Sequence, residues 1–453
     1  MVLSPSGLMN LCRQARLRAK LPRLELGSLA YQQRGKRDER NGYLRKKKKR
    51  MLRNTAARLV AANVRTAPRT FTPAFVRPLS TTAPRLFATP TESSETFKVT
   101  LPDTSFEGFK CDPPSLDIEI SKGELLNMYT RMVSMRRMEM AADGLYKAKQ
   151  IRGFCHLCTG QEAVSVGMEF AITPEDHIIT AYRCHGFTYM RGGNIKSIVA
   201  ELLGRKDGIS KGKGGSMHMF ANNFYGGNGI VGAQVPVGAG IAFAQKYLGN
   251  NNITFALYGD GAANQGQVFE AYNMAKLWDL PVAFVCENNR YGMGTSAARS
   301  SASTKYFTRG DYIPGIKVNG MDVLAVRQAC AFAKEWTSSG KGPLVMEMDT
   351  YRYGGHSMSD PGTTYRTREE IQHMRSTSDA ITGLKQRLLD LGAATEAEIK
   401  TIDKDARQVV DDAVEEAKAS PPPDDSTLYT DIYHKGTEPK FLRGREPDEI
   451  HYF

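Results

Sequence analysis

The sequence predicts an α/β protein with a mostly parallel sheet flanked by helices. Three short apolar segments indicate buried strands, and helix-like segments separate them. In chain order the expected strands are residues 254–258, 281–286 and 343–348, and the expected helices between them are residues 264–277 and 323–336. Strands that alternate with helices favour parallel pairing, because each helical crossover returns the chain to the same edge of the sheet.

Further helical regions flank this pattern. Residues 124–149 place apolar side chains near helical spacing, which predicts a helix before the first strand. From residue 366 to about residue 419 the chain is charged and helical, and three prolines that begin at Pro421 end that region. We expect one domain over residues 91–420 and a C-terminal tail over residues 421–453.

The net charge of +13 is unevenly distributed. Residues 1–90 contain 21 Lys and Arg against 3 Asp and Glu, whereas the remainder contains 40 against 45. Residues 51–90 are rich in Arg, Ala, Ser and Thr and contain no acidic residue, which is typical of a mitochondrial transit peptide. We therefore expect a protein of the mitochondrial matrix.

A second basic segment precedes the predicted transit peptide. Residues 1–50 end in six consecutive Lys and Arg, and the transit peptide begins at a methionine, Met51. Our hypothesis is that Met51 is the native start and that residues 1–50 are an extension absent from the native protein. A nucleic-acid-binding protein is an alternative supported only by residues 34–50, and the acidic remainder of the chain argues against it.

Membrane and disulfide classes are not indicated. No segment reaches the roughly 18–20 continuous apolar residues that a spanning helix needs. The seven cysteines form no disulfide framework at this chain length and suit a reducing compartment. Cys155 and Cys158 have the spacing of a redox pair or half a metal site, but no second pair lies nearby, so we expect buried, inert thiols.

The strongest local motif is Gly259-Asp260-Gly261, between the strand at 254–258 and the helix at 264–277. Glycines let the backbone approach a ligand closely, and a helix N-terminus attracts phosphate. Asp260 would hold a divalent cation beside that phosphate. For an isolated motif of this kind, a turn with an exposed aspartate is the alternative interpretation.

A second motif makes the cation site more specific. The strand at 281–286 is followed by Asn288 and Asn289. Adjacent parallel strands end at the same edge of the sheet, so we expect Asn289 to face Asp260. A carboxylate, an amide oxygen, a backbone carbonyl and two phosphate oxygens make most of an octahedral Mg²⁺ site.

These two motifs together resemble the thiamin diphosphate signature of the transketolase-like superfamily. Longer segments resemble the alpha subunits of the pyruvate dehydrogenase component of mitochondrial 2-oxo acid dehydrogenase complexes, over residues 123–432. The similarity is carried by residues 152–163, 180–193, 211–219, 226–242, 259–275, 286–296 and 351–370. It implies a thiamin diphosphate-binding fold.

The resemblance also implies roles for residues at matching positions. The implied Mg²⁺ ligands are Asp260, Asn289 and the carbonyl of Tyr291. The residues implied to surround the diphosphate are Tyr182, Arg183, Gly261, Ala262 and His356. Backbone groups of Gly229 and Val231 would meet the aminopyrimidine ring, and His156 would line the substrate end. Judged alone, each histidine would be a hydrogen-bonded structural residue, and Arg183 would equally suit an intrachain ion pair.

The implied reaction is the oxidative decarboxylation of pyruvate, which links glycolysis to acetyl-CoA. The acetyl group would pass to the lipoyl arm of an acetyltransferase component. The resemblance gives catalytic roles to His356, His156, Tyr182 and Arg183, and the two histidines could stabilise charge or relay protons with pKa values near the working pH. An alpha subunit of a branched-chain 2-oxo acid or acetoin dehydrogenase is the alternative.

Such enzymes also need a second, pyrimidine-binding domain, and no second copy is apparent in the sequence. The resemblance therefore implies a beta subunit in an α2β2 heterotetramer, and we expect no activity from this chain alone.

A loop rich in glycine and flanked by arginines spans residues 352–366. The resemblance implies that it lines the active site and is phosphorylated at Ser357, with a further site at Ser296, by a regulatory kinase opposed by a phosphatase. Thr364 stands where animal relatives commonly carry a second loop serine. Phosphate beside a site built for anions would repel the diphosphate and pyruvate.

Overall fold

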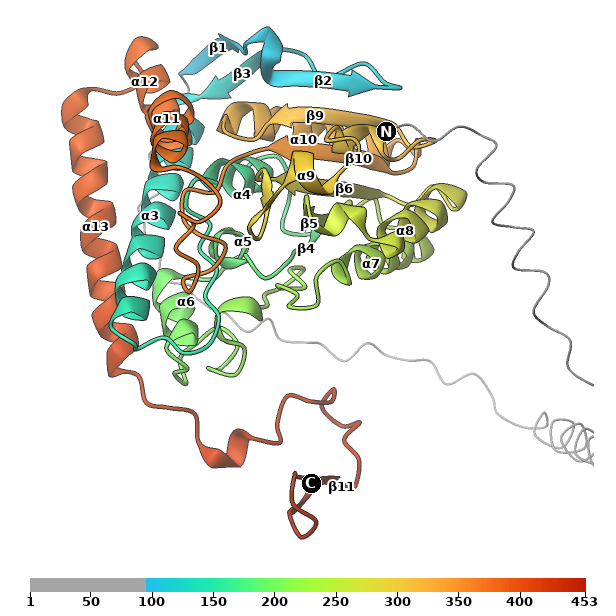
Figure 1. Cartoon of the computed structure of the whole chain (residues 1–453), viewed down its shortest axis with the longest axis vertical. Coiled ribbons are helices and arrows are strands. Elements are labelled where there is room, and N and C mark those ends of the chain that lie inside the picture. Colours follow the sequence, from blue (N-terminus) through green and yellow to red (C-terminus); the bar gives the residue numbers. More distant parts are fainter. Residues whose placement is uncertain (1–94) are drawn as a thin grey trace, which may run out of the picture. The chain divides into compact units, whose positions relative to one another are not determined.

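The fold is described by a computed structural model that covers residues 95–453. The predictions for residues 1–50 and 51–90 lie outside the described residues. At the centre is a six-stranded sheet in the order β2-β9-β10-β6-β5-β4 (Figure 1). Its strands are β2 (Phe106–Phe109), β9 (Gly315–Asn319), β10 (Leu344–Asp349), β6 (Val282–Asn288), β5 (Thr254–Gly259) and β4 (His177–Ile179). All neighbours pair in parallel except β2, which is antiparallel to β9. The predicted mostly parallel sheet is confirmed.

Helices cover both faces of this sheet, and alternate side chains of each strand pack against them. On β5, Phe255 and Leu257 belong to one apolar cluster, whereas Ala256 and Tyr258 belong to another. The first cluster includes residues of α3 (Lys122–Lys147), α4 (Glu162–Glu169) and α10 (Val323–Ser338). The second includes residues of α7 (Gln234–Leu248) and α8 (Gly266–Leu277). Burial on both faces explains why the predicted strands are continuously apolar.

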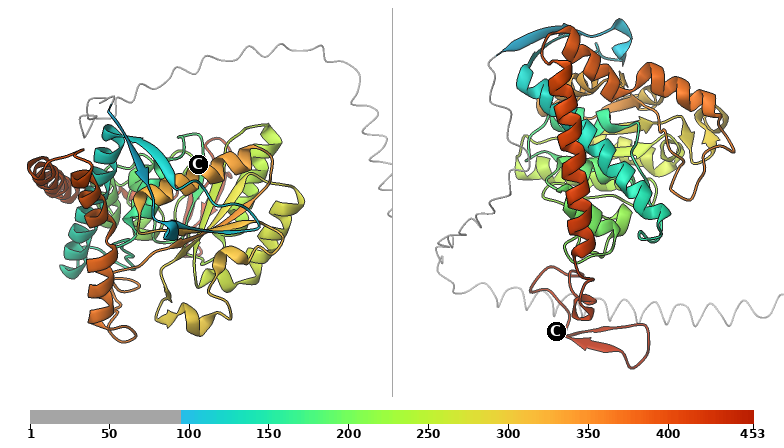
Figure 2. Two further views of the ribbon diagram at one scale, coloured as in Figure 1. Left: turned by 90° about the horizontal axis from the view of Figure 1, so that it is seen from above. Right: turned by 90° about the vertical axis from the view of Figure 1, so that its left-hand side faces the viewer.

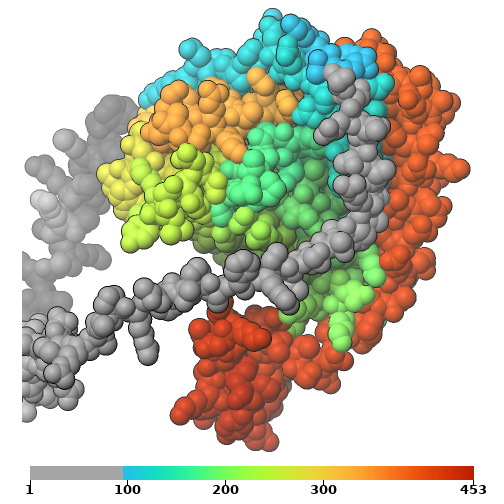
Figure 3. All heavy atoms as spheres, turned by 180° about the vertical axis from the view of Figure 1, so that it is seen from behind, coloured from blue at the N-terminus to red at the C-terminus, as the bar shows by residue number. Residues whose placement is uncertain are grey.

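The remaining elements surround this core. An antiparallel pair, β1 (Thr96–Thr100) and β3 (Asp117–Ser121), leads into α3, which begins with a capping box between Ser121 and Glu124. The other helices are α5 (His185–Met190), α6 (Ile195–Leu202), α9 (Ala297–Ser300), α11 (Arg368–Ser378), α12 (Ala380–Asp390) and α13 (Glu396–Ala419). Figure 2 (right) shows α13 running alongside α3, and it also contacts α6. From behind, α13 forms a band along one edge of the body (Figure 3).

Some boundaries differ from the prediction. The helix expected from residue 264 begins at Gly266, because a 3₁₀ turn (Ala262–Asn264) comes first and Gln265 is extended. Side-chain hydrogen bonds from Ser301 and Arg309 hold Asn264 in that turn. The charged region after residue 366, predicted to be helical, consists of the three helices α11, α12 and α13. The tail contains a small antiparallel pair, β11 (Phe441–Arg443) and β12 (Ile450–Tyr452).

Two sequence-level expectations concern the described residues as a whole. Over residues 95–453, the structure contains no helix of the length and hydrophobicity needed to cross a bilayer. The six cysteines of this region are free thiols. Cys155 and Cys158 are buried, and burial raises the pKa of both, to about 12 for Cys155.

Candidate active site

The carboxyl ends of β5 and β6 bring the two sequence motifs together. Gly259, the last residue of β5, pairs with Glu287 near the end of β6, so Asp260 and Asn289 follow neighbouring strands at the same edge. The two turns are also in close contact. A Cβ atom added at Gly292 would lie 3.3 Å from the Cα of Gly261 and 3.7 Å from Oδ2 of Asp260. A side chain at position 292 would therefore press on the backbone of Gly261.

Asp260 is a buried carboxylate without a complete set of partners. Its side chain is 2% exposed, and its Oδ2 atom accepts no hydrogen bond from any described residue. Burial raises the pKa of Asp260 to about 6, and the charge of Arg352 opposes this rise. Buried polar atoms are rarely left unpaired. The unpaired Oδ2 atom of Asp260 therefore suits a bound cation, which would take the place of a hydrogen-bond donor from the protein.

Two further oxygens converge on the same region. The guanidinium of Arg352 donates from Nη1 to Oδ1 of Asn289 at 3.4 Å and to the carbonyl of Tyr291 at 3.3 Å. Arg352 is 1% exposed and forms no ion pair with a described carboxylate. The structure thus brings together the three implied Mg²⁺ ligands, Asp260, Asn289 and Tyr291, around a region that already attracts a positive group. Sequence analysis missed Arg352, since no spacing rule connects residue 352 with residues 289 and 291.

Arg183 lies in the segment between β4 and α5. It donates hydrogen bonds to the carbonyls of Leu157 and His356, the latter at 3.0 Å. The intrachain ion pair considered as an alternative is not present among residues 95–453, so the charge of Arg183 is not neutralised by a neighbouring carboxylate within 4 Å. A nearly buried, uncompensated guanidinium fits a phosphate or carboxylate ligand.

Three aromatic rings cluster next to Arg183. The His156 ring lies 4.4 Å from the Tyr182 ring and 5.3 Å from the His356 ring, measured between centroids, and Tyr182 and His356 are 5.4 Å apart. Both histidines have a buried Nδ1 atom without a hydrogen-bond partner among the described residues. The interpretation of these histidines as hydrogen-bonded structural residues therefore does not account for their ring nitrogens.

The expectation that both histidines have pKa values near the working pH is wrong for this structure. Burial, together with the charge of Arg183, lowers the pKa of His156 to about 3 and that of His356 to about 4. Both rings are therefore neutral near pH 7. An anionic ligand beside Arg183 would favour the charged imidazole and raise both pKa values again.

The opposite end of the site lies at the surface. Gly229 and Val231 belong to the loop before α7, where Val231 is 42% exposed and its neighbour Ile230 is 72% exposed. The carbonyl of Val231 accepts a hydrogen bond of 2.9 Å from Nε2 of Gln265. Gly261 is exposed, whereas Ala262 is buried directly behind it. The site therefore runs from a buried charged end to an open apolar end.

The loop at 352–366 closes over the histidine end. Asp360 holds its turn by accepting hydrogen bonds from the backbone N–H of His356 (2.6 Å), from that of Gly362 (2.9 Å) and from the hydroxyl of Tyr365. Ser357 is 7% exposed, and its hydroxyl lies 2.9 Å from that of Ser359. Modification of Ser357 therefore requires the loop to open.

The second predicted modification residue is connected to the cation site. Ser296 ends β8 (Thr295–Ser296), which pairs with β7 (Tyr291–Gly292), and Ser296 lies opposite Tyr291 in this pairing. A charge added at Ser296 would disturb the backbone that carries the carbonyl of Tyr291.

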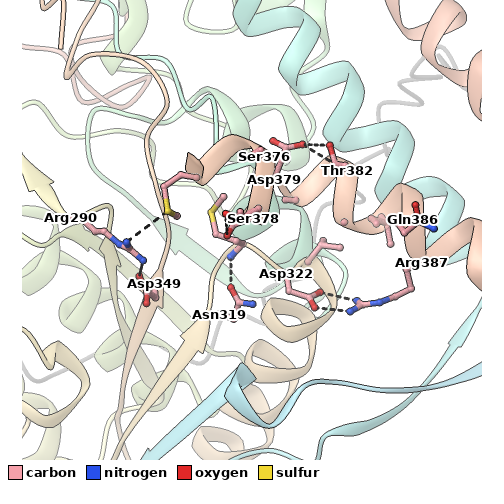
Figure 4. A pocket seen from close by; sticks show the side chains of 17 residues that line it. Arg290, Asn319, Asp322, Asp349, Ser376, Ser378, Asp379, Thr382, Gln386 and Arg387 are labelled. Atoms are coloured by element: carbon pink, nitrogen blue, oxygen red, sulfur yellow. Dashed lines mark hydrogen bonds and ion pairs between the residues drawn. The ribbon is translucent and has the colours of Figure 1, made fainter. Parts of the chain in front are cut away.

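A separate polar pocket of about 420 Å³ lies between the sheet edge and the α11–α12 junction (Figure 4). Its charged side chains are already paired: Arg387 donates to Asp322 at 3.0 and 3.1 Å, and Arg290 lies 3.4 Å from Asp349. These pairs leave no uncompensated charge for a ligand, so we assign no site to this pocket.

Comparison with known proteins identifies the family. A model of the family described as the dehydrogenase E1 component matches residues 130–426, which is more than half of the chain. The chain belongs to the dehydrogenase E1 component family. This E1 family depends on thiamin diphosphate, which agrees with the cofactor expected from the two motifs. The Asp260 oxygen without a partner and the uncompensated charge of Arg183 fit the metal-bound and anionic parts of such a cofactor.

Individual relatives of this E1 chain are highly similar. The mitochondrial "pyruvate dehydrogenase E1 component subunit alpha" of Saccharomyces cerevisiae is 66% identical over 360 residues, which cover 79% of this chain and 86% of the relative. The protein of the same name from Chaetomium thermophilum is 65% identical over 366 residues, which cover 80% and 89%. The human somatic form is 57% identical over 349 residues, which cover 76% and 89%.

Proposed function

We propose that this chain is the alpha subunit of a mitochondrial pyruvate dehydrogenase E1 component. It takes part in the oxidative decarboxylation of pyruvate and in transfer of the acetyl group to the lipoyl arm of an acetyltransferase component. The observation that carries the proposal is the group formed by buried Asp260 and Asn289 and the carbonyl of Tyr291, together with the buried, unpaired charge of Arg183. This cluster lies in a chain that is 57–66% identical to three alpha subunits named for that activity.

In this proposal Mg²⁺ and the diphosphate share the buried end of the site. Asp260, Asn289 and the carbonyl of Tyr291 bind the metal, and the orphaned Oδ2 atom of Asp260 supports this assignment. Tyr182, Arg183, Gly261, Ala262 and His356 surround the diphosphate. When bound, thiamin diphosphate supplies an electron sink that allows a 2-oxo acid to lose carbon dioxide.

The residues of this chain orient the reactants and control charge. Arg183 neutralises anionic groups at the buried end, where the low local dielectric makes its charge most effective. His156 and His356 offer ring nitrogens within the same small space, and they exchange a proton with substrate once an anion has raised their pKa values. Backbone groups of Gly229 and Val231 contact the aminopyrimidine at the open end.

The open end also supports a role for a beta subunit. Ile230 and Val231 are exposed beside the site, and α7 exposes Val237, Phe243 and Tyr247 nearby in the chain. Apolar side chains gathered in this way indicate a protein contact rather than a solvent-facing surface. We propose that a beta subunit covers this face in an α2β2 heterotetramer and supplies the carboxylate that acts on the aminopyrimidine.

Location and regulation complete the proposal. The composition of residues 51–90 and the mitochondrial relatives support import into the matrix. We propose phosphorylation of Ser357 and Ser296 by a kinase, reversed by a phosphatase. The burial of Ser357 and the pairing of Ser296 with Tyr291 support a link between each modification and the site.

Co-expression with the beta subunit of the same organism tests the function. The αβ complex should release carbon dioxide from pyruvate and acetylate a lipoyl domain in the presence of thiamin diphosphate and Mg²⁺. The alpha chain alone, at equal concentration, should not. Turnover by the alpha chain alone would contradict the half-site proposal, and a preference for branched-chain 2-oxo acids or acetoin over pyruvate would contradict the substrate assignment.

A further inference from the structure

A buried chain of three polar side chains lies directly behind His156. The carboxylate of Glu139 on α3 lies 3.0 and 3.1 Å from Nδ1 of His185, and Nε2 of His185 lies 2.9 Å from the hydroxyl of Ser216. His185 and Glu139 are 0% exposed and Ser216 is 5% exposed. Serine, histidine and acid are thus aligned at hydrogen-bond distances, although the three residues are far apart in the sequence.

This chain of side chains holds the segment around His156 at two points. The hydroxyl of Ser216 accepts the backbone N–H of His156 at 3.3 Å, and the carboxylate of Glu139 accepts the backbone N–H of Cys158 at 3.0 Å. One donor arrangement satisfies every group: the Ser216 hydroxyl donates to Nε2 of His185, and the Nδ1–H of His185 donates to Glu139. Each of the two hydrogen bonds, Ser216 to His185 and His185 to Glu139, then has one donated proton and one acceptor.

The state of the carboxylate agrees with this arrangement. Burial alone would raise the pKa of Glu139, but its partners lower it overall: a positive charge on His185 would act in this direction, and so do the hydrogen bonds from the ring of His185 and from the N–H of Cys158. Glu139 is therefore an ionised, fully buried acceptor. Removing one partner of such a group leaves an unpaired charge or polar atom in the interior, which is costly.

The arrangement is not that of a hydrolytic triad. A nucleophilic serine must meet a substrate, whereas Ser216 is enclosed and its oxygen already accepts the N–H of His156. The three side chains can affect the site only through His156, whose ring contacts the rings of Tyr182 and His356. What the three residues fix is the backbone from which that ring projects.

We propose that Glu139, His185 and Ser216 form a buried positioning relay that fixes the backbone on both sides of His156 and so aims its ring at the substrate. They act through His156 and do not touch substrate themselves. The proposal rests on the proposed function for the role of His156, but the relay itself is independent of the reaction. Loss of any link lets the segment at 155–158 open from α3, while the proposed metal ligands, which follow β5 and β6, stay in place.

Hydrogen exchange in the αβ complex tests the relay directly. In Ser216→Ala, the amides of residues 155–158 should exchange about five- to tenfold faster than in the wild type, the factor expected for one lost hydrogen bond. Ser216→Thr keeps the hydroxyl and should restore slow exchange. The matched control is Ser165→Ala, which removes a buried hydroxyl that bonds to Met135 and to the carbonyl of Glu162; it should leave the exchange of this segment unchanged.

Kinetics supply the second readout. Ser216→Ala should raise the KM for pyruvate several-fold, and Ser216→Thr should return it towards the wild-type value. Unchanged exchange in Ser216→Ala, or equal acceleration in Ser165→Ala, would overturn the relay. If the wild-type complex has no activity towards pyruvate but the exchange results hold, the proposed function fails and the relay stands.

Discussion

Asp260 is the residue at which stability and function oppose each other most clearly. Its carboxylate is removed from water before any metal compensates for that removal, and the rise of its pKa to about 6 measures the resulting penalty. A carboxylate whose folded pKa is raised destabilises the folded state progressively as the pH rises above its ordinary value of 3.8, and fully above about 6, because the charged form prefers the unfolded chain.

Asp260→Asn should therefore stabilise the cofactor-free protein while abolishing Mg²⁺-dependent binding of thiamin diphosphate. A shift of about two pKa units corresponds to roughly 3 kcal/mol at pH 7, which is an upper bound on the gain in the free energy of unfolding. Calorimetric unfolding without cofactor measures the first effect, and titration calorimetry with Mg²⁺ and thiamin diphosphate measures the second. Wild-type cofactor affinity in this variant would exclude Asp260 as a ligand.

The two site histidines predict an acid sensitivity of the cofactor-free protein. Their folded pKa values are about 3 and about 4, below the ordinary value of 6.5, so the unfolded chain binds protons first as the pH falls. Stability contributed by these neutral rings should be lost progressively from about pH 6.5 downwards. In a double variant, His156→Gln with His356→Gln, the melting temperature should fall less between pH 6.5 and pH 4.

The control for this measurement is an exposed histidine on α11. His373→Gln makes the same substitution at an exposed position outside the site and is the reference against which the double variant is compared. An identical acid limb in the double variant and the wild type would show that the two rings titrate normally.

For single residues, the sequence predicts the position of a side chain correctly when that residue directly follows a strand. Asp260 and Asn289 follow two neighbouring parallel strands, so their approach could be predicted. Arg352 could not, because its guanidinium reaches the site from a loop whose path depends on Asp360 and Tyr365. The pKa values of the histidines depend on burial and on Arg183, neither of which a local motif reveals.

At the scale of an element, the loop at 352–366 is where the proposed phosphorylation would act. Its turn depends on hydrogen bonds to one carboxylate, that of Asp360, and Ser357 lies buried within it. A negative charge at position 357 would be placed in a low-dielectric space near Asp360, so the loop can accommodate it only by opening.

Ser357→Glu should lose most of its activity towards pyruvate in the αβ complex while remaining folded. The loop should also become more sensitive to proteolysis, and the helix and strand content should be unchanged because only Tyr353 and Met358 of the loop pack against the apolar clusters. Ser357→Ala is the matched control and should keep the wild-type protease resistance. Near-normal turnover of Ser357→Glu would refute the role of the loop.

Elements were predicted well where both faces of a strand are buried and poorly where an element is short. β5, β6 and β10 were found from their apolar runs, whereas β4, with three residues, carries too little pattern to be recognised. The start of α8 was placed two residues too early, because the extended backbone at Gln265 depends on contacts of Asn264 with Ser301 and Arg309.

At the scale of the whole molecule, the described residues form a complete apolar core, and we propose that they carry only half of the active site. The sheet is buried on both faces, but the site ends at an apolar surface that includes Ile230 and the outer face of α7. An exposed apolar surface of this kind indicates a contact with a partner, whereas the sheet is buried within this chain alone. We therefore expect the alpha chain to fold before a partner completes the site.

Phe243→Asp on α7 should weaken assembly with the beta subunit without unfolding the alpha chain. Phe243 is 47% exposed, so a charge there costs little in the free chain but would be buried unpaired in an interface. Sedimentation of the co-expressed subunits measures assembly, and thermal unfolding of the alpha chain measures its integrity. Tyr312→Asp, at a 49% exposed position outside α7, serves as the control; equal loss of assembly in both variants would contradict a specific contact at α7.

The outer strands of the main sheet have a consequence for solubility. β2 and β4 span only four and three residues, and Ile178 of β4 already forms a bridge with Phe224. Few backbone groups at either border are left for a strand of another molecule to join. The sheet is therefore a poor template for fibril growth, and ordered association is left to the side chains of the helices.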